Sequence, residues 1–363
     1  DACGIGSLTL SQTTFVCAEV GANTETLTVE DNNGNTTTCN TTITVQDNVA
    51  PVAVCQDITV QLNAGGNATA NPVLANNGST DACGIASYSL SQTAFVCGEV
   101  GGNAETLTVT DINGNSSNCN LTITVQDNVA PTASCQNVTV QLDVSGNGST
   151  TANDVNDGST DACGIAGTAL DITTFNCGDV GNNVVELTVT DNNSNSATCN
   201  ATIVVQDNVA PVAVCQDVTI QLNAGGSATT TAAASDNGSN DACGINGFTI
   251  TQTSFDCTEV GANTETLTVE DNNSNTSTCE TTITVQDNVA PIATCQDVTV
   301  QLDATGNGST TPAAVGGSST DACGIATLSL SQSAFVCAEV GANTETLTAT
   351  DNNGNSTNCT ATI

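Results

Sequence analysis

The stretch "ETLTVTDINGNSSNCNLTITV", residues 105–125, decides the fold of this chain. On both sides of its centre, "DINGN" at 111–115, apolar and polar side chains alternate, as they do in a β-strand with one buried face. Leu107 and Val109 share a face before the centre, and Leu121 and Ile123 share one after it. A centre rich in Asp, Asn and Gly is typical of a tight turn. The stretch therefore predicts a β-hairpin.

The hairpin stretch belongs to a repeat of 80 residues, marked by "DACGI" at Asp1, Asp81, Asp161, Asp241 and Asp321. The joint "QDNVAP" between repeats keeps the same spacing, with prolines at Pro51, Pro131, Pro211 and Pro291. Because a fixed period takes precedence over total length, the 363 residues are about 4.5 copies of one unit. We expect a partial repeat at 1–47 (its C-terminal half), repeats at 48–127, 128–207 and 208–287, and a repeat at 288–363 whose last strand is truncated.

The rest of each repeat also favours short strands. In the second repeat we expect them at 58–62, 70–74, 86–90 and 95–97, and no window shows helical periodicity. Six or seven short strands with frequent turns predict an all-β fold, an immunoglobulin-like β-sandwich repeated in a linear rod. The core is aliphatic with one Phe per repeat, such as Phe95. A unit of this size has little interior, so we expect covalent or metal staples.

The charge balance is extreme, with 37 acidic residues, no Lys, Arg or His, and a net charge of −37. Nucleic acid and anionic membrane surfaces are excluded as partners because both require basic patches. Acid–base catalysis by His or Lys is excluded, and the same acids recur in every repeat, so we expect no enzyme. No apolar run is long enough for membrane insertion. Clustered carboxylates must be hydrated, protonated or bound to metal cations.

The 19 cysteines indicate an oxidising, extracellular setting. A zinc site would need closely spaced Cys pairs or His, and the chain has neither, so disulfides are favoured. Of the three connectivities within a repeat, we favour Cys83–Cys97 and Cys55–Cys119, which leaves Cys39 without a partner. The cysteines expected in disulfides are Cys3, Cys17, Cys83, Cys97, Cys163, Cys177, Cys243, Cys257, Cys323, Cys337, Cys55, Cys119, Cys135, Cys199, Cys215, Cys279, Cys295 and Cys359.

Two interpretations of the incomplete terminal repeats stay open. There is no initiator Met or signal peptide, which is typical of a mature or excised segment, and Ile363 stands 37 residues before the next expected "DACGI". The chain is then either a window of a longer array, or a protomer that polymerises head to tail by strand addition at an open sheet edge. In both cases the expected partners are copies of the same repeat.

Residues 105–131 resemble the closing half of a hyalin-repeat (HYR) module, with a strand, an Asp-x-x-Gly-Asn turn, a Cys-bearing strand and an Asp-x-x-Pro exit. "PVAVCQDITVQL" at 51–62 resembles its opening, whereas the cysteines of "DACGI" and "FVC" are additional to the family pattern. The resemblance implies an Ig-like tandem-repeat protein of the kind found as stalks and adhesins in Bacteroidota-like bacteria. It implies an extracellular or cell-surface location and scaffolding or adhesion.

The joint "QDNVAP" is also similar to the cadherin linker, which binds calcium between successive sandwiches. Ca²⁺ prefers carboxylate and carbonyl oxygens, and we expect Asp127 and Asn128 to converge with the hairpin residue Asp111. Asp81 and Glu99 are further candidates on loops that the pattern does not place. The alternative is that these are ordinary turn residues. The expected calcium ligands are Asp47, Asn48, Asp127, Asn128, Asp207, Asn208, Asp287, Asn288, Asp31, Asp111, Asp191, Asp271 and Asp351.

These features predict an extracellular structural protein, a disulfide-locked, calcium-stiffened rod that serves as protomer of a filament or as a surface stalk. A rod requires near-identical repeats, and no repeat differs from the others as one bearing an active site would. The alternative is an adhesin whose repeats bind glycan or a partner protein. Carbohydrate sites usually expose aromatic side chains, and this chain has a single Tyr, Tyr88, and no Trp.

Overall fold

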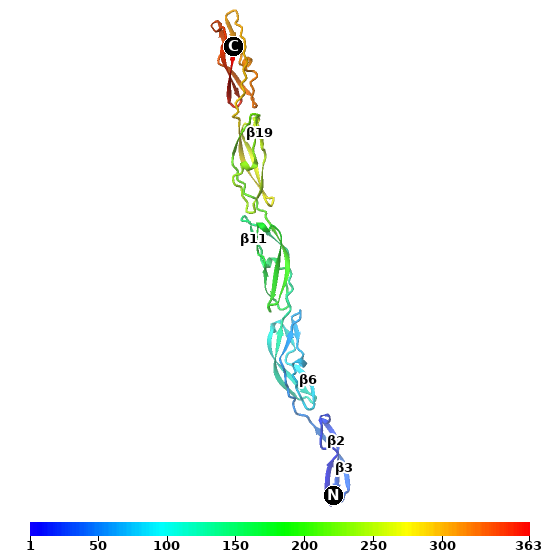
Figure 1. Cartoon of the computed structure of the whole chain (residues 1–363). Helices are drawn as coiled ribbons and strands as arrows, with labels where there is room; N and C mark the ends of the chain where they lie inside the picture. The colour runs from blue at the N-terminus through cyan, green and yellow to red at the C-terminus, as the bar shows by residue number, and fades with distance from the viewer. The chain divides into compact units, whose positions relative to one another are not determined.

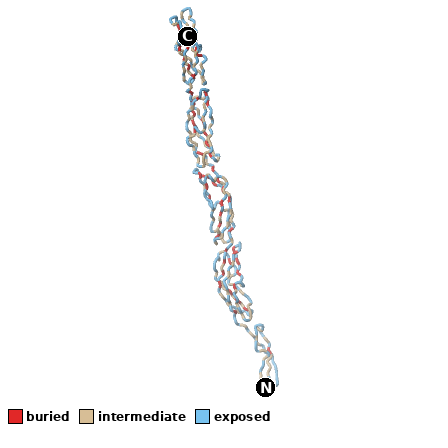
Figure 2. The backbone as a smooth tube through the Cα atoms, in the orientation of Figure 1, coloured by how far each residue is buried: buried red, intermediate tan, exposed pale blue.

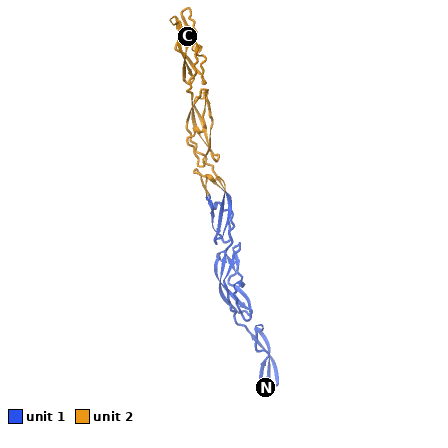
Figure 3. Cartoon of the chain, viewed as in Figure 1, with its two compact units in different colours: residues 1–138, 150–173, 184–202 blue, residues 139–149, 174–183, 203–363 orange.

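The computed structural model describes all residues, 1–363, and the chain forms two compact units (Figure 3). One unit contains residues 1–138, 150–173 and 184–202, and the other contains 139–149, 174–183 and 203–363. The boundary lies in the third repeat, so the second repeat represents the first unit below and the fourth repeat represents the second.

The second, third and fourth repeats have the same strands in the same order, the first repeat has only the later elements, and the fifth lacks the first strand. Figure 1 shows the course of the chain. The first repeat has β1 (Ile5–Leu10), η1 (Cys17–Glu19), β2 (Gly21–Asp31) and β3 (Thr36–Val45). The second has β4 (Ile58–Gln61), β5 (Asn67–Thr69), α1 (Pro72–Ala75), β6 (Ile85–Leu90), β7 (Ala94–Val96), η2 (Cys97–Glu99), β8 (Gly101–Asp111) and β9 (Ser116–Gln126).

The third repeat has β10 (Val138–Gln141), β11 (Asn147–Ser149), α2 (Ala152–Val155), β12 (Ile165–Leu170), β13 (Thr174–Asn176), η3 (Cys177–Asp179), β14 (Gly181–Asp191) and β15 (Ser196–Gln206). The fourth has β16 (Val218–Gln221), β17 (Ser227–Thr229), η4 (Ala232–Ser235), β18 (Ile245–Ile250), β19 (Ser254–Asp256), η5 (Cys257–Glu259), β20 (Gly261–Asp271) and β21 (Thr276–Gln286). The fifth has β22 (Asn307–Ser309), α3 (Pro312–Gly316), β23 (Ile325–Leu330), β24 (Ala334–Val336), η6 (Cys337–Glu339), β25 (Thr344–Asp351) and β26 (Ser356–Thr362).

Each complete repeat is a small β-sandwich. In the second repeat a four-stranded sheet has the order β4-β9-β8-β6, and β5 and β7 form a second, two-stranded sheet. The first strand, β4, runs parallel to the last, β9, and the other pairs are antiparallel. The fourth repeat has the same topology, with β16-β21-β20-β18 and β17-β19. The predicted fold class is confirmed.

The predicted hairpin is β8 and β9, paired in register with Leu107 opposite Cys119. Leu107, Val109 and Ile123 are fully buried, and Phe95 closes the core from the second sheet. Figure 2 shows buried positions in the second to fifth repeats, whereas in the first repeat only Glu25 is buried. The alternation predicted from residues 105–125 is therefore the alternation of the core.

One predicted strand is wrong. Residues 72–75, which overlap the strand expected at 70–74, form the single turn α1. Pro72 occupies the first position of this helix, where a backbone N–H would have no partner within the helix, so proline loses no hydrogen bond there. The Asn71 side chain accepts a hydrogen bond from the Val73 backbone N–H. A turn this short leaves no helical periodicity in the sequence, which is why the pattern did not indicate it.

Candidate metal centre at the joints

The cysteines form two sets of disulfides. The first set lies within repeats and joins the segment before the first strand to the last strand, as Cys55–Cys119 does. This pairing was predicted, and it follows from the parallel pairing of β4 with β9, which brings the two segments side by side. The set comprises Cys55–Cys119, Cys135–Cys199, Cys215–Cys279 and Cys295–Cys359.

The second set connects consecutive repeats, and here the predicted pair Cys83–Cys97 is wrong. Cys83 precedes β6 and lies near the end of β8, whereas Cys97 lies near the start of β8, an 11-residue strand. That strand spans about 35 Å, far beyond the reach of a disulfide. Each of these cysteines instead bonds to a neighbouring repeat. The bonds are Cys17–Cys83, Cys97–Cys163, Cys177–Cys243 and Cys257–Cys323, each with a Cα–Cα distance of 5.1 Å.

Three cysteines are unpaired: Cys3, Cys39 and Cys337. Cys39 was predicted to lack a partner, whereas Cys3 and Cys337 were expected in disulfides. In the second set each bond joins residues 66 apart, so the counterpart of Cys337 would be residue 337 + 66 = 403. The counterpart of Cys3 would likewise precede residue 1. Cys3 and Cys337 are therefore unpaired because their bonds would be to other repeats, and not to a cysteine of the same repeat.

The repeats also touch at the joint itself. In the second repeat the turn before β5 contains Gly66, which has a φ of +74°. A Cβ atom at this position would come within 2.7 Å of the Cys97 Sγ and 3.2 Å of the Ala162 Cβ in the next repeat. Glycine is therefore required both by the backbone conformation and by the close approach of the neighbouring "DACGI" loop.

The disulfide between repeats lies beside a pair of carboxylates. At the joint between the second and third repeats, carboxylate oxygens of Asp127 and Asp161 and the Cys163 Sγ all lie within 4.8 Å of one another. We call this group the joint cluster. Its equivalents at the other joints are Asp47, Asp81 and Cys83; Asp207, Asp241 and Cys243; and Asp287, Asp321 and Cys323.

Within the joint cluster one buried carboxylate oxygen has no hydrogen-bond partner. Asp127 is 6% exposed, and its Oδ1 accepts a hydrogen bond from the Val129 backbone N–H. Its Oδ2 is buried and unpaired, as is the Oδ2 of Asp47, Asp207 and Asp287. The Asp161 Oδ1 accepts from the Cys163 backbone N–H. A buried carboxylate oxygen without a partner is costly, so its recurrence at all four joints indicates a place for a cation.

The hairpin aspartates, also predicted as calcium ligands, have both carboxylate oxygens hydrogen-bonded. The Asp191 Oδ1 accepts hydrogen bonds from the backbone N–H groups of Asn193 and Asn195, and its Oδ2 accepts from the Asn195 side chain. The residues at 31, 111, 271 and 351 accept the same three bonds. This is the arrangement expected for turn residues, the alternative raised by the sequence.

These hydrogen bonds affect the charge state of Asp191. Burial raises the pKa of this carboxyl, but the hydrogen bonds from Asn195, Asn193 and Ser194 outweigh burial and lower the pKa below its ordinary value of 3.8. A carboxyl whose pKa is lower in the folded chain contributes stability at pH values above 3.8. That contribution is lost as the pH falls below 3.8 and through the lower folded pKa.

A hairpin meets each joint, but it is not the hairpin that was predicted. The Asn195 side chain donates to the Asp191 Oδ2 and also to the Asp127 backbone carbonyl, at 3.1 Å. Asp127 therefore meets the hairpin of the following repeat, and Asp111, its predicted neighbour, lies at the other end of β8 and β9. Asp111 is connected in the same way to Asp47 of the preceding joint, through Asn115.

Two other predicted candidates have polar partners elsewhere. The exposed Asn128 donates its side-chain N–H to the Gln61 Oε1, and Asn208 and Asn288 make the equivalent bond. Glu99 accepts hydrogen bonds from the Gln92 side chain and, more weakly in effect, the Val96 backbone N–H, and these bonds lower the pKa of its carboxyl. Asp161 and its equivalents, by contrast, belong to the joint cluster. The signal for them was the Asp that begins every "DACGI".

The donor set of the joint cluster suits a hard cation. Both carboxylates supply oxygen, and Cys163 is in a disulfide and so offers no thiolate. With no Lys, Arg or His in the chain, no cationic side chain can neutralise the two acids. Ca²⁺ takes six to eight oxygen ligands, often completed by backbone carbonyls and water. The residues present therefore fit calcium better than zinc.

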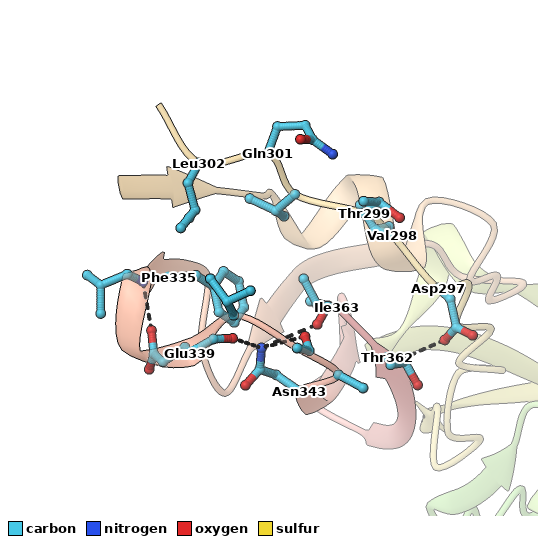
Figure 4. Close-up of a pocket in the computed structure, with 15 residues that line it drawn as sticks. Asp297, Val298, Thr299, Gln301, Leu302, Phe335, Glu339, Asn343, Thr362 and Ile363 are labelled. Atoms are coloured by element: carbon cyan, nitrogen blue, oxygen red, sulfur yellow. Dashed lines mark hydrogen bonds between the residues drawn. The ribbon is translucent and has the colours of Figure 1, made fainter. Parts of the chain in front are cut away.

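A cavity of about 650 Å³ lies in the fifth repeat, lined by residues that include Leu302, Phe335 and Ile363 (Figure 4). Residues 298–301 on its rim form no strand, whereas their equivalents in the fourth repeat, β16, pair with β21 up to Gln286. We therefore attach no ligand-binding function to the cavity.

No protein-family model and no curated protein matches this chain. Among solved structures it is similar to the extracellular domain of protocadherin gammaB4, with 15% identity over 98% of this chain and 76% of that chain and a TM-score of 0.30. It is also similar to protocadherin gamma B2 cadherin domains 1–5 (13%, 99% and 86%, 0.30) and Drosophila N-cadherin EC1–4 (13%, 85% and 97%, 0.24).

The chain's own features give its broad class. It is a tandem array of β-sandwich repeats with eight disulfides. Disulfides in this number are characteristic of extracellular proteins. None of the helices has the length and hydrophobicity needed to cross a membrane. The repeated sandwiches and the disulfides are features of extracellular structural or adhesion proteins.

Proposed function

We propose that this chain is an extracellular structural protein, a stalk or a filament protomer, whose joints are stiffened by calcium. The observation that carries the proposal is the buried, unpaired Oδ2 of Asp127 beside the Asp161 carboxylate, repeated at all four joints. A cation between these two acids would supply the missing partner and remove their mutual repulsion. Because Asp127 ends one repeat and Asp161 begins the "DACGI" loop of the next, such an ion would hold the two repeats in one orientation.

The near-identity of the joints supports a structural function. The same carboxylate pair, the same asparagine bridge and the same disulfide recur at each joint. A structural array needs the same geometry at every step, whereas a single binding or catalytic site would make one repeat different from the others. The hairpin aspartates are given no ligand role in this proposal, because their hydrogen-bonding capacity is already used.

Equilibrium dialysis of the oxidised chain against calcium, after treatment with EDTA, tests the proposal. We expect about four ions per chain, one for each joint cluster. Asp127→Asn removes one carboxylate from one cluster and should reduce the number by one. If calcium instead bound non-specifically to exposed carboxylates, the number of bound ions would not equal the number of joint clusters.

The matched control is Asp157→Asn, which removes the same charge from an exposed position where the second and fourth repeats have Asn77 and Asn237. This variant should keep all four ions. If the native chain binds no calcium, or if Asp127→Asn and Asp157→Asn bind equal amounts, the calcium proposal is wrong.

A further inference from the structure

The disulfides between repeats create a second covalent connection along the chain. Cys83 and Cys97 stand 14 residues apart in the second repeat and bond to the first and third repeats, respectively. Cys163 and Cys177, and then Cys243 and Cys257, repeat this spacing of 14 residues. Short peptide segments therefore alternate with disulfides, and the path that they form skips most of every repeat.

We propose that these disulfides make the chain a tether that resists extension, because tension follows this short covalent path. Between the two termini the path contains 90 residue steps, against 362 along the full chain. Its peptide segments are 1–17, 83–97, 163–177, 243–257, 295–323 and 359–363, with 16, 14, 14, 14, 28 and 4 steps.

The path determines how far the chain can lengthen when its sandwiches unfold. At about 3.5 Å per extended residue, 90 steps span about 32 nm, and the five disulfides on the path bring the limit to about 34 nm. A fully reduced chain of 362 steps reaches about 127 nm. Intact disulfides therefore hold the extension to about a quarter of what the same residues allow.

The joints are protected by the same connectivity. Asp127 and Asp161 both lie between Cys97 and Cys163, in the loop that this disulfide closes. Strands β8 and β9 lie in the same loop. Once the path is taut, none of these residues is part of it, so pulling on the chain cannot draw the two acids apart through the backbone between them. The disulfides within repeats hold the sandwich together but, apart from Cys295–Cys359 near the C-terminus, are not on the path.

Single-molecule stretching of the full chain, held by handles at both termini, tests the tether. In EDTA the oxidised chain should stop at about 34 nm, and the same molecule should extend to about 127 nm after reduction by dithiothreitol. Calcium is absent, so failure of the calcium proposal would not change this result. An oxidised chain that extends beyond about 60 nm would overturn the tether.

Two double variants locate the tension. Cys97→Ser with Cys163→Ser removes one disulfide between repeats, and the shortest path then runs through Cys55–Cys119 and Cys135–Cys199. That path is 38 steps longer, so the limit should rise by about 14 nm. Cys135→Ser with Cys199→Ser removes a disulfide that the intact path does not use, and the limit should not change.

The reverse order, with lengthening only in the Cys135 and Cys199 variant, would show that bonds within repeats carry the tension and would overturn the proposal. Both extension limits are read on unfolded chains, so neither depends on the stability of the variant.

Disulfide mapping of the native chain provides an independent check. The chain has no Lys or Arg for trypsin, so an Asp/Glu-specific protease is used without reduction. No Asp or Glu lies between Cys83 and Cys97, so both stay in peptide 82–99. This peptide is expected to be joined by a disulfide to peptide 162–171, which contains Cys163. A peptide 82–99 that is joined to no other peptide and has an internal disulfide would contradict the proposal.

Discussion

The hairpin turn and the joint each contain a buried aspartate, and the two carboxylates are held in opposite ways. Asp191 in the hairpin is 1% exposed and Asp127 at the joint is 6% exposed. The Asp191 carboxylate accepts three hydrogen bonds from its own turn. Asp127 accepts one through Oδ1, while its Oδ2 has none. Both residues contact Asn195, so they differ in hydrogen bonding and not in location.

This difference separates a structural acid from a candidate ligand. A carboxylate whose lone pairs are all engaged by N–H groups organises the backbone around it and has little left to offer an ion. A carboxylate that is buried, unpaired and next to a second acid destabilises the folded chain unless a cation binds. Burial and residue type are the same in the two cases, so the hydrogen-bond partners decide the function.

The largest effect is expected from Asp191→Ala, which leaves three N–H donors of the turn without their acceptor. Bonds to a charged acceptor are strong, so amide hydrogen exchange at Asn193 and Asn195 should become faster by on the order of 100-fold. The increase should be the same in calcium and in EDTA, because the turn does not depend on an ion. Hydrogen exchange followed by mass spectrometry or NMR measures it.

Asp157→Ala, at an exposed position of the same repeat, is the control and should leave these amides unchanged. An increase below about threefold for Asp191→Ala, or one seen only in EDTA, would mean that the hairpin aspartate is held by calcium and that the two regions are alike.

A smaller effect, opposite in sign, is expected from Asp127→Asn. In EDTA the substitution removes an unpaired buried charge beside Asp161, so exchange of the Val129 amide should slow by about fivefold. In saturating calcium the same variant should exchange faster than the native chain, because it has lost a ligand. The reversal between the two conditions is the signature of a metal-binding carboxylate.

Asp157→Asn should change exchange at Val129 by less than about twofold in either condition. If the Val129 amide exchanged faster in Asp127→Asn than in the native chain in EDTA, the Asp127 carboxylate would be a structural acceptor like that of Asp191. The proposed difference between the two aspartates would then be wrong.

Much of this architecture was predictable from residue patterns. The alternation at 105–125 predicted β8 and β9, and Cys55–Cys119 followed from joining the first and last strands. The bonds between repeats do not follow from the cysteine spacing, because that spacing does not show which loops of consecutive repeats meet. The length of β8 rules out a bond between Cys83 and Cys97, since this strand separates them by the length of the sandwich. The same strands place Asp111 away from Asp127, and a pattern in one dimension does not show at which end each loop lies.

Asp161 is the equivalent of Asp81, a candidate whose loop the sequence did not place, and this loop meets the joint of the preceding repeat. The pairing of Asp127 with Asp161 depends on how two consecutive sandwiches contact each other, through the Gly66 turn and the Cys97–Cys163 bond. The sequence contains both acids at a fixed spacing, but that contact is a property of the folded joint.

The smallest effect is expected within the hairpin, at the residue after Asn193. Ser194 has a φ of +73°, where the first, second and fifth repeats have glycine at +85°, +95° and +95°. A side chain is strained in this left-handed region, and glycine is not, although glycine also makes the unfolded chain more flexible. Ser194→Gly should therefore stabilise the turn slightly and slow exchange at Asn195 by about threefold.

The reciprocal change, Gly114→Ser, should speed exchange at Asn115 by a similar factor, which makes the pair a control for the chemistry of the substitution. Neither variant alters a joint carboxylate, so both should still bind about four calcium ions, one per joint cluster. A change in the number of ions on Ser194→Gly would show that turn geometry and the joint site are coupled through Asn195. In that case the hairpin would be part of the metal centre and not only its neighbour.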